Sequence, residues 1–206
     1  MRKRVIGQAG AMIVIISGPS GVGKDTILRC LRQEASDPPR HYVVTYKTRL
    51  PRPNEVEGID YQFITTDEFE KLLAKGRLLE SALVHGDWSG TPRDQVVEAL
   101  TSGRDAILKI DVQGAEAIHD IVPDALRIFV APPDEAQLEA RLRGRGTETP
   151  EELARRNADA EEELRRRAEF DYVVVNENNK ADRTAEQIDE IIRHEHHLYP
   201  DRRIEF

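Results

Sequence analysis

A short glycine-rich segment, GPSGVGKDT, contains residue types that are suited to binding phosphate. It places Gly18 and Gly23 five positions apart and follows the second glycine with Lys24. Glycines let backbone N–H groups approach anionic oxygens closely, and the lysine adds a positive charge that can follow a phosphoryl group during transfer. The spacing is that of the phosphate-binding loop G-x-x-x-x-G-K-[ST]. The segment therefore predicts a nucleotide site with ATP as its ligand.

The loop departs from this pattern at one position. Asp25 stands where a Ser or Thr hydroxyl would contact Mg²⁺. A carboxylate is a good ligand for a hard cation, so we expect Asp25 to bind the Mg²⁺ that accompanies ATP. The alternative is that Asp25 only places a favourable negative charge at a helix N-terminus, while ATP and water hold the metal.

A second group of polar residues suits a separate phosphate. Arg49 and Arg52 lie among prolines, with Tyr61 further along the chain. Guanidinium groups and a phenol are good donors to phosphate oxygens. A solvated basic loop is the alternative for this stretch.

The elements that must position these residues alternate between strands and helices. Met12 to Ile16 is an apolar run rich in β-branched residues, which predicts a buried strand, and a helix is expected near Lys24 to Glu34. Further strands are predicted at Tyr42 to Tyr46, Ala106 to Ile110, Arg127 to Ala131 and Tyr172 to Val175. A capping pattern predicts that another helix begins near Pro150. This alternation indicates an α/β fold with a parallel sheet.

Composition limits the class of protein. The chain has 206 residues, a net charge of −8 and 5% aromatic residues, which favours one compact domain and argues against a general nucleic-acid-binding surface. Its single cysteine, Cys30, excludes an intramolecular disulfide and is compatible with a reducing cytoplasm. No stretch is long enough to cross a bilayer. We therefore expect a cytoplasmic protein without nucleic-acid or membrane partners.

Several ordered segments together resemble the guanylate kinase family, and the likeness runs from Ile13 to about Ile192. These segments are GPSGVGK (Gly18 to Lys24), TRLPRP (Thr48 to Pro53), EGIDYQF (Glu57 to Phe63), LLE (Leu78 to Glu80), VHG with GTPR (Val84 to Arg93), IDVQGA (Ile110 to Ala115), RLRGRGTET (Arg141 to Thr149) and DYVVVN (Asp171 to Asn176).

The resemblance implies a P-loop nucleoside monophosphate kinase fold in a single domain, residues 1–206. Its core would comprise residues 11–46 and 101–206, with a GMP-binding lobe at about 47–100 and an arginine-rich lid at about 141–157. The implied activity transfers the ATP γ-phosphoryl group to GMP, and to dGMP, giving ADP and GDP in purine nucleotide metabolism. The implied oligomeric state is a monomer or homodimer.

The resemblance also implies three sets of site residues. ATP would be held by Gly18, Pro19, Ser20, Gly21, Val22, Gly23, Lys24, Asp25 and Thr26. GMP would be held by Thr45, Arg49, Arg52, Tyr61, Glu80, Thr91 and Asp111. The catalytic cations would be Lys24, Arg141, Arg145 and Arg156.

Chemistry supports the carboxylates in the GMP set. Guanine carries donors at N1 and N2, which Glu80 and Asp111 can accept, and adenine lacks this pair of donors. For Glu80 taken alone, an exposed carboxylate at a helix end is the alternative.

Two further positions depart from the family. Lys109 replaces a residue that is commonly acidic, and Ser89 replaces a tyrosine that usually joins the acceptor-phosphate site. Lys109 and Asp111 would share one face of a strand, so Lys109 would point towards the site that Asp111 lines. Asp25 and Lys109 are departures of opposite charge at this expected site, so we expect Lys109 to offset the charge of Asp25. We expect the shorter Ser89 to lower acceptor affinity relative to a tyrosine.

Two other functions remain as alternatives. The unusual GKD sequence would suit a related kinase that acts on a sugar phosphate, although such an acceptor has no guanine edge for Glu80 and Asp111. A catalytically impaired module that binds phosphopeptides would not need Lys24 and its glycines. The C-terminal histidines, His194 to His197, lack a matching cluster elsewhere, and we expect a solvated helix end there rather than a metal site.

Overall fold

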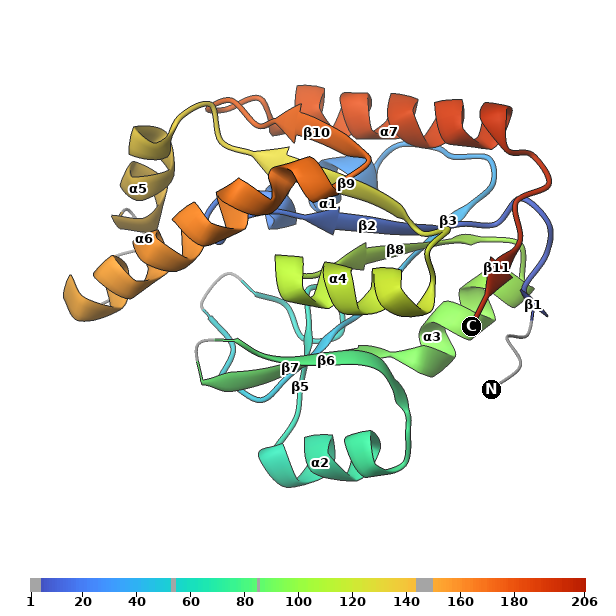
Figure 1. The fold of residues 1–206 in the computed structure, drawn as a ribbon, viewed down its shortest axis with the longest axis horizontal. Helices are drawn as coiled ribbons and strands as arrows, with labels where there is room; N and C mark the ends of the chain where they lie inside the picture. The colour runs from blue at the N-terminus through green and yellow to red at the C-terminus, as the bar shows by residue number, and fades with distance from the viewer. Residues whose placement is uncertain (1–4, 53–54, 85, 144–149) are drawn as a thin grey trace. The chain divides into compact units, whose positions relative to one another are not determined.

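The computed structural model describes residues 5–52, 55–84, 86–143 and 150–206. The chain forms two compact units, each made of segments that are distant in sequence. Unit 1 comprises Met1–Ile15, Ser36–Leu126 and Tyr199–Phe206, and unit 2 comprises Ile16–Ala35 and Arg127–Leu198. Figure 1 shows the helices and strands of both units, coloured along the chain.

Within the described residues, five strands form one sheet in the order β10-β9-β2-β8-β3. Strand β2 (Ile13–Ser17) is buried along its whole length, as its apolar sequence predicts. The boundary between the units falls within this strand, between Ile15 and Ile16. Pairs β10–β9 and β3–β8 are parallel, which confirms the predicted α/β class with a parallel sheet.

Unit 1 contains a second sheet as well as part of the first. In the described residues its strand order is β5-β4-β7-β6, with both parallel and antiparallel pairs. The elements of unit 1 are β1 (Val5–Ile6), β3 (Arg40–Tyr42), β4 (Tyr46–Lys47), β5 (Gln62–Phe63), α2 (Thr66–Ala74), β6 (Leu78–Val84), β7 (Asp87–Pro92), α3 (Arg93–Thr101), β8 (Asp105–Lys109), α4 (Val112–Ile121) and β11 (Ile204–Glu205).

The single strand expected at Tyr42 to Tyr46 was wrong, because this stretch belongs to two sheets. Strand β3 ends at Tyr42 and pairs with β8, whereas β4 begins at Tyr46 and pairs with β5 and β7. Between them, the backbone N–H of Val44 donates to the Gln95 side chain instead of a neighbouring strand. Local sequence carries no signal for this change of partner.

Unit 2 places helices beside strands β9 and β10. Its elements are α1 (Lys24–Leu31), β9 (Leu126–Ala131, with Leu126 assigned to unit 1), α5 (Glu135–Arg143), α6 (Pro150–Arg165), the 3₁₀ helix η1 (Arg166–Glu169), β10 (Tyr172–Val175) and α7 (Ala181–Leu198). Helix α7 runs alongside β10 and packs against α1 (Figure 1). The predicted start of α6 at Pro150 is confirmed.

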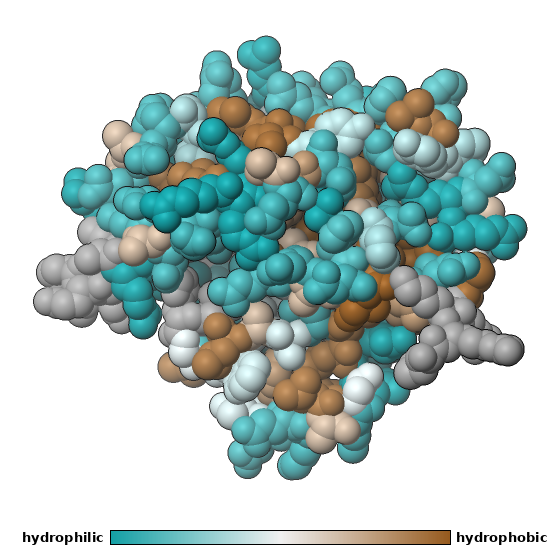
Figure 2. Space-filling model, viewed as in Figure 1, coloured by the Kyte–Doolittle hydropathy of each residue, from teal (hydrophilic) through white to brown (hydrophobic). Residues whose placement is uncertain are grey.

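The surface is mostly polar. Hydrophilic side chains dominate the face seen in Figure 2, in keeping with a chain of which 33% is charged. No helix in the described residues is long and apolar enough to span a membrane.

Candidate functional site

The glycine-rich loop joins β2 to α1 and lies in unit 2. Gly18 has φ +134°, and a Cβ there would lie 2.2 Å from the carbonyl oxygen of Val130. Gly23 has φ +101°, and its Cβ would lie 2.6 Å from Nδ2 of Asn176. Both positions therefore require glycine, because the backbone conformation and the adjoining atoms exclude a side chain. The loop has the compact form that phosphate binding needs.

Lys24 folds back over this loop. Its ammonium donates to the carbonyl oxygens of Gly18 and Pro19, the latter at 3.1 Å. These bonds keep the cation beside the backbone that would surround a phosphate chain. The role predicted for Lys24 in phosphate binding stays a prediction.

Asp25 lies in the first turn of α1. The N-cap is Gly23, which has no side chain to cap this end of the helix. The carboxylate of Asp25 is therefore not the N-cap group, although its charge still lies where the helix dipole favours an anion. A hard oxygen donor next to a phosphate loop fits the ligand chemistry of Mg²⁺.

Asn176 is a buried loop-supporting residue to which the sequence analysis gave no role. Its Nδ2 donates to the carbonyl oxygen of Val22 at 2.8 Å, and its Oδ1 accepts from Thr184 at 3.1 Å. These bonds join the phosphate loop to β10 and α7. Asn176 is part of the segment DYVVVN, but only folding brings it next to Val22, which lies 154 positions earlier in the sequence.

Arg141, a predicted catalytic residue, also contacts the loop. It donates to the carbonyl oxygens of Val22 at 3.0 Å and Asn176 at 2.8 Å, and to Oδ1 of Asn178 at 2.8 Å. The guanidinium is thus held beside the loop by neutral oxygens. Arg156 lies on α6 of the same unit, and Arg145 lies outside the described residues.

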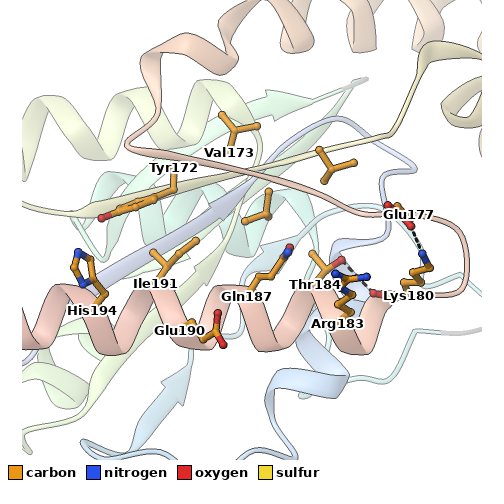
Figure 3. Close-up of a pocket in the computed structure, with 12 residues that line it drawn as sticks. Tyr172, Val173, Glu177, Lys180, Arg183, Thr184, Gln187, Glu190, Ile191 and His194 are labelled. Atoms are coloured by element: carbon orange, nitrogen blue, oxygen red, sulfur yellow. Dashed lines mark hydrogen bonds and ion pairs between the residues drawn. The ribbon is translucent and has the colours of Figure 1, made fainter.

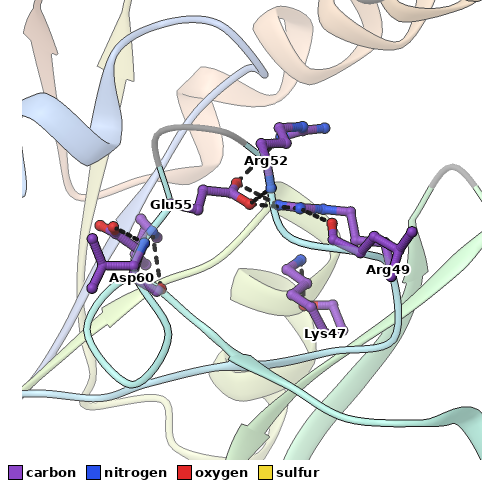
Figure 4. Close-up of polar contacts among 9 residues, drawn as sticks. Lys47, Arg49, Arg52, Glu55 and Asp60 are labelled. Atoms are coloured by element: carbon purple, nitrogen blue, oxygen red, sulfur yellow. Dashed lines mark hydrogen bonds and ion pairs between the residues drawn. The ribbon is translucent and has the colours of Figure 1, made fainter.

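All seven residues predicted to bind GMP lie in unit 1, and the arginines among them share one carboxylate. Arg49 donates two hydrogen bonds to Glu55, at 2.7 and 2.6 Å, and the backbone N–H of Arg52 donates to the same group at 2.9 Å. The side chain of Arg52 lies 3.6 Å from it (Figure 4). Glu55, which the sequence analysis missed, therefore orients both arginines.

Three cations surround the ring of Tyr61. The ammonium of Lys109 lies 3.8 Å from the ring centroid, and Arg49 and Lys47 lie at 5.3 and 5.5 Å. Lys109 also donates to the carbonyl oxygen of Asp60 at 3.4 Å. This part of unit 1 has a concentration of positive charge suited to an anion.

Glu80 and Thr91 form a buried pair on the four-stranded sheet. They are direct partners in the β6–β7 register, and the Thr91 hydroxyl donates to Oε1 of Glu80 at 2.6 Å. Glu80 is 6% exposed, so the exposed helix-end alternative is wrong. Burial raises the pKa of Glu80 to about 7, and the nearby Asp111 also raises it, while the Thr91 hydrogen bond opposes the change. Thr45 is also buried.

Asp111 follows β8 and acts as the N-cap of α4. Its Oδ1 accepts from the backbone N–H of Gly114 at 2.8 Å. Strand β8 ends at Lys109, so the expectation that Asp111 lies on the same strand was wrong. The helix begins immediately after Asp111, because its side chain satisfies an N-terminal N–H group. The proposed charge compensation between Lys109 and Asp25 stays a prediction.

Lys47 is another residue that the sequence analysis missed. It pairs with Ser89 across strands β4 and β7, and its Nζ donates to the buried Ser89 hydroxyl at 2.8 Å. Burial lowers the pKa of Lys47 to about 8, and Arg49 and Lys109 lower it further, while Asp111 and Glu80 oppose the shift. Its position opposite Ser89 depends on strand register, which the sequence alone did not reveal.

A groove between β10 and α7 in unit 2 lacks this chemistry. Its volume is about 600 Å³, and Figure 3 shows Tyr172, Val173 and Ile191 among its walls, with an ion pair between Glu177 and Lys180 at one end. His194 also lines this groove. No group of three metal-ligating side chains occurs among the described residues, the C-terminal histidines included.

Comparisons with known proteins show which family the chain resembles. The guanylate kinase family model matches residues 10–195. A guanylate kinase of Mycobacterium sp. (strain MCS) is 46% identical over 172 residues, covering 82% of this chain and 86% of its own length. The guanylate kinase of Streptococcus agalactiae serotype III (strain NEM316) is 44% identical over 189 residues, covering 90% of this chain and 88% of its own length.

Solved structures give the same result. The crystal structure of guanylate kinase from Anaplasma phagocytophilum has a TM-score of 0.72 and 28% sequence identity, covering 94% of this chain and 88% of that one. The match of the family model, residues 10–195, includes segments of both units. The chain belongs to the guanylate kinase family.

Proposed function

We propose that this enzyme transfers the γ-phosphoryl group of ATP to GMP, and also to dGMP, giving ADP and GDP. The observation that carries the proposal is the buried Glu80–Thr91 pair in the acceptor half, with Asp111 at the start of α4. A buried carboxylate with a pKa raised to about 7 needs a donor partner when it is ionised. Guanine supplies such donors.

The base would be recognised through its donor edge. Glu80 and Asp111 would accept from guanine N1–H and the N2 amino group, and the hydroxyls of Thr45 and Thr91 would bind the remaining edge. AMP would leave Glu80 without these donors. Cytosine and uracil do not offer the same pair, so the site should discriminate among nucleotides.

The phosphate of the acceptor would lie among Arg49, Arg52 and Tyr61. Glu55 holds both arginines, which limits the conformational entropy lost on binding. A mononucleotide bound at these two places would have a fixed orientation. Proximity and orientation are the main requirements for phosphoryl transfer.

The ATP half would use the glycine-rich loop of unit 2. Backbone N–H groups from Gly18 to Thr26 and the ammonium of Lys24 would hold the β- and γ-phosphates. Asp25 would hold Mg²⁺, which when bound neutralises charge on the ATP phosphates. Arg141, Arg145 and Arg156 would donate to the phosphoryl group and stabilise its charge. No side chain needs to act as a nucleophile.

The decisive assay measures ADP release with ATP and Mg²⁺, offering GMP, dGMP, AMP, CMP, UMP and ribose 5-phosphate in separate reactions. Turnover confined to GMP and dGMP is expected. Turnover with ribose 5-phosphate alone would favour the sugar-phosphate kinase, and binding of ATP without any turnover would refute the proposal.

We also propose that the enzyme acts in the cytoplasm as a monomer or homodimer, without nucleic-acid or membrane partners.

A further inference from the structure

The four-stranded sheet of unit 1 gathers polar side chains on one face. Ser89 and Thr91 are two positions apart on β7, so both side chains point to the same side of the sheet. Each has a cross-strand partner, Lys47 on β4 for Ser89 and Glu80 on β6 for Thr91. Directly opposed side chains lie close together on one face. This face therefore carries a carboxylate beside a hydroxyl at one point (Glu80 and Thr91) and an ammonium beside a hydroxyl at another (Lys47 and Ser89).

Lys47 differs from the arginines beside it in its partners. Arg49 is already neutralised by two hydrogen bonds to Glu55, whereas Lys47 makes no ion pair with any described residue. Its hydrogen-bond partner is the neutral Ser89 hydroxyl, which leaves other ammonium protons for a ligand. In Figure 4 the Lys47 side chain extends toward the Arg49–Glu55 pair. A buried ammonium without a direct ion pair is costly, and a bound anion would relieve that cost.

We propose that Lys47, held by Ser89, binds the phosphate of the acceptor nucleotide together with Arg49 and Tyr61. This proposal rests on the proposed function and adds a cation that the family resemblance did not assign. It also explains Ser89, because a small hydroxyl leaves room for the lysine where a tyrosine would fill the space. The lowered pKa of Lys47 agrees with this position among Arg49 and Lys109.

The test follows binding through Trp88, the single tryptophan of the chain, which adjoins Ser89 on β7 and stacks on Phe69. The wild type, Lys47→Met and Lys47→Arg are each titrated with GMP, guanosine and inorganic phosphate, and the tryptophan fluorescence is recorded. Lys75→Met, an exposed lysine at the end of α2, is the matched control. Each protein is measured at about pH 7, where Lys47 is charged.

Lys47→Met should weaken GMP binding about 10- to 100-fold, which is the range for a lost charge-assisted hydrogen bond, and leave guanosine binding unchanged. Lys47→Arg should keep most of the affinity, and Lys75→Met all of it. Above about pH 8, GMP affinity should fall in the wild type but not in Lys47→Arg, because arginine stays protonated. Asp111, Glu80, Arg49 and Lys109 face Lys47 and set the midpoint of this change.

Equal losses for GMP and guanosine in Lys47→Met would overturn the proposal, since they would indicate a structural defect. Unchanged GMP binding would overturn it as well. If neither GMP nor guanosine binds to the wild type, the proposed function fails separately. Inorganic phosphate then decides: a fluorescence response that Lys47→Met loses supports the phosphate site, and an equal response or none in both proteins overturns it. Ser89→Tyr should also weaken GMP binding, contrary to the expectation from sequence, because the phenol would displace Lys47.

Discussion

Replacing Glu80 by Gln should stabilise the unliganded enzyme at neutral and alkaline pH. Glu80 is 6% exposed, and burial raises the pKa of its carboxyl group from 4.5 to about 7, with Asp111 adding to the change. Each pKa unit corresponds to about 1.4 kcal/mol, so ionised Glu80 costs the folded protein about 3 kcal/mol. Glutamine has nearly the same shape and carries no charge.

The direction of the pH dependence follows from where the proton binds. Between about pH 4.5 and 7, folded Glu80 holds a proton that the unfolded chain has released. The free energy of unfolding therefore falls as the pH rises through this window and is constant above it, as far as this group is concerned. The stability of Glu80→Gln relative to the wild type should rise by about 3 kcal/mol over the same window.

Urea unfolding followed by Trp88 fluorescence measures this difference at about pH 4 and about pH 8. Glu70→Gln, on the exposed side of α2, is the control and should show a much smaller change. In the same variant, GMP affinity should fall about 10- to 100-fold, because charge-assisted hydrogen bonds are lost. A relative stability that stays within about 1 kcal/mol at both pH values would refute the account of Glu80 as a strained buried anion.

Three other predictions concern the acceptor residues and the glycine-rich loop. The KM for GMP should be lowest between about pH 7 and 8, where Glu80 is ionised and Lys47 is protonated, and initial rates across pH would contradict this if KM were flat. Gly18→Ala should lower the free energy of unfolding by about 3 kcal/mol, because its Cβ would lie 2.2 Å from a carbonyl oxygen of β9 and φ is positive. Gly58→Ala, where nothing lies within 4 Å, should cost only about 1 kcal/mol in the same unfolding assay, and equal losses would show that the contact is unimportant. Asp25→Ser should shift the Mg²⁺ concentration that gives half-maximal rate, and an unchanged Mg²⁺ dependence would mean that Asp25 does not hold the metal.

Much of the fold was predictable because it depends on local patterns. The apolar strand before the loop, the strand at Tyr172–Val175 and the helix start at Pro150 each follow from a few neighbouring residues. The stretch around Val44 was mispredicted, because its two ends pair with different sheets. Strand pairing between distant segments leaves little trace in local hydrophobicity.

The sequence by itself determined the phosphate loop, since its glycines, its lysine and the helix after it lie within one short segment. Through the family resemblance it also predicted a set of acceptor residues. The tertiary structure alone decided their electrostatic state. Glu80 has a raised pKa because folding buries it and brings it near Asp111, and Lys47 faces Ser89 because two strands pair in a register that brings together residues 42 positions apart. Burial and register are properties of the folded chain, and they set which charges are available to a ligand.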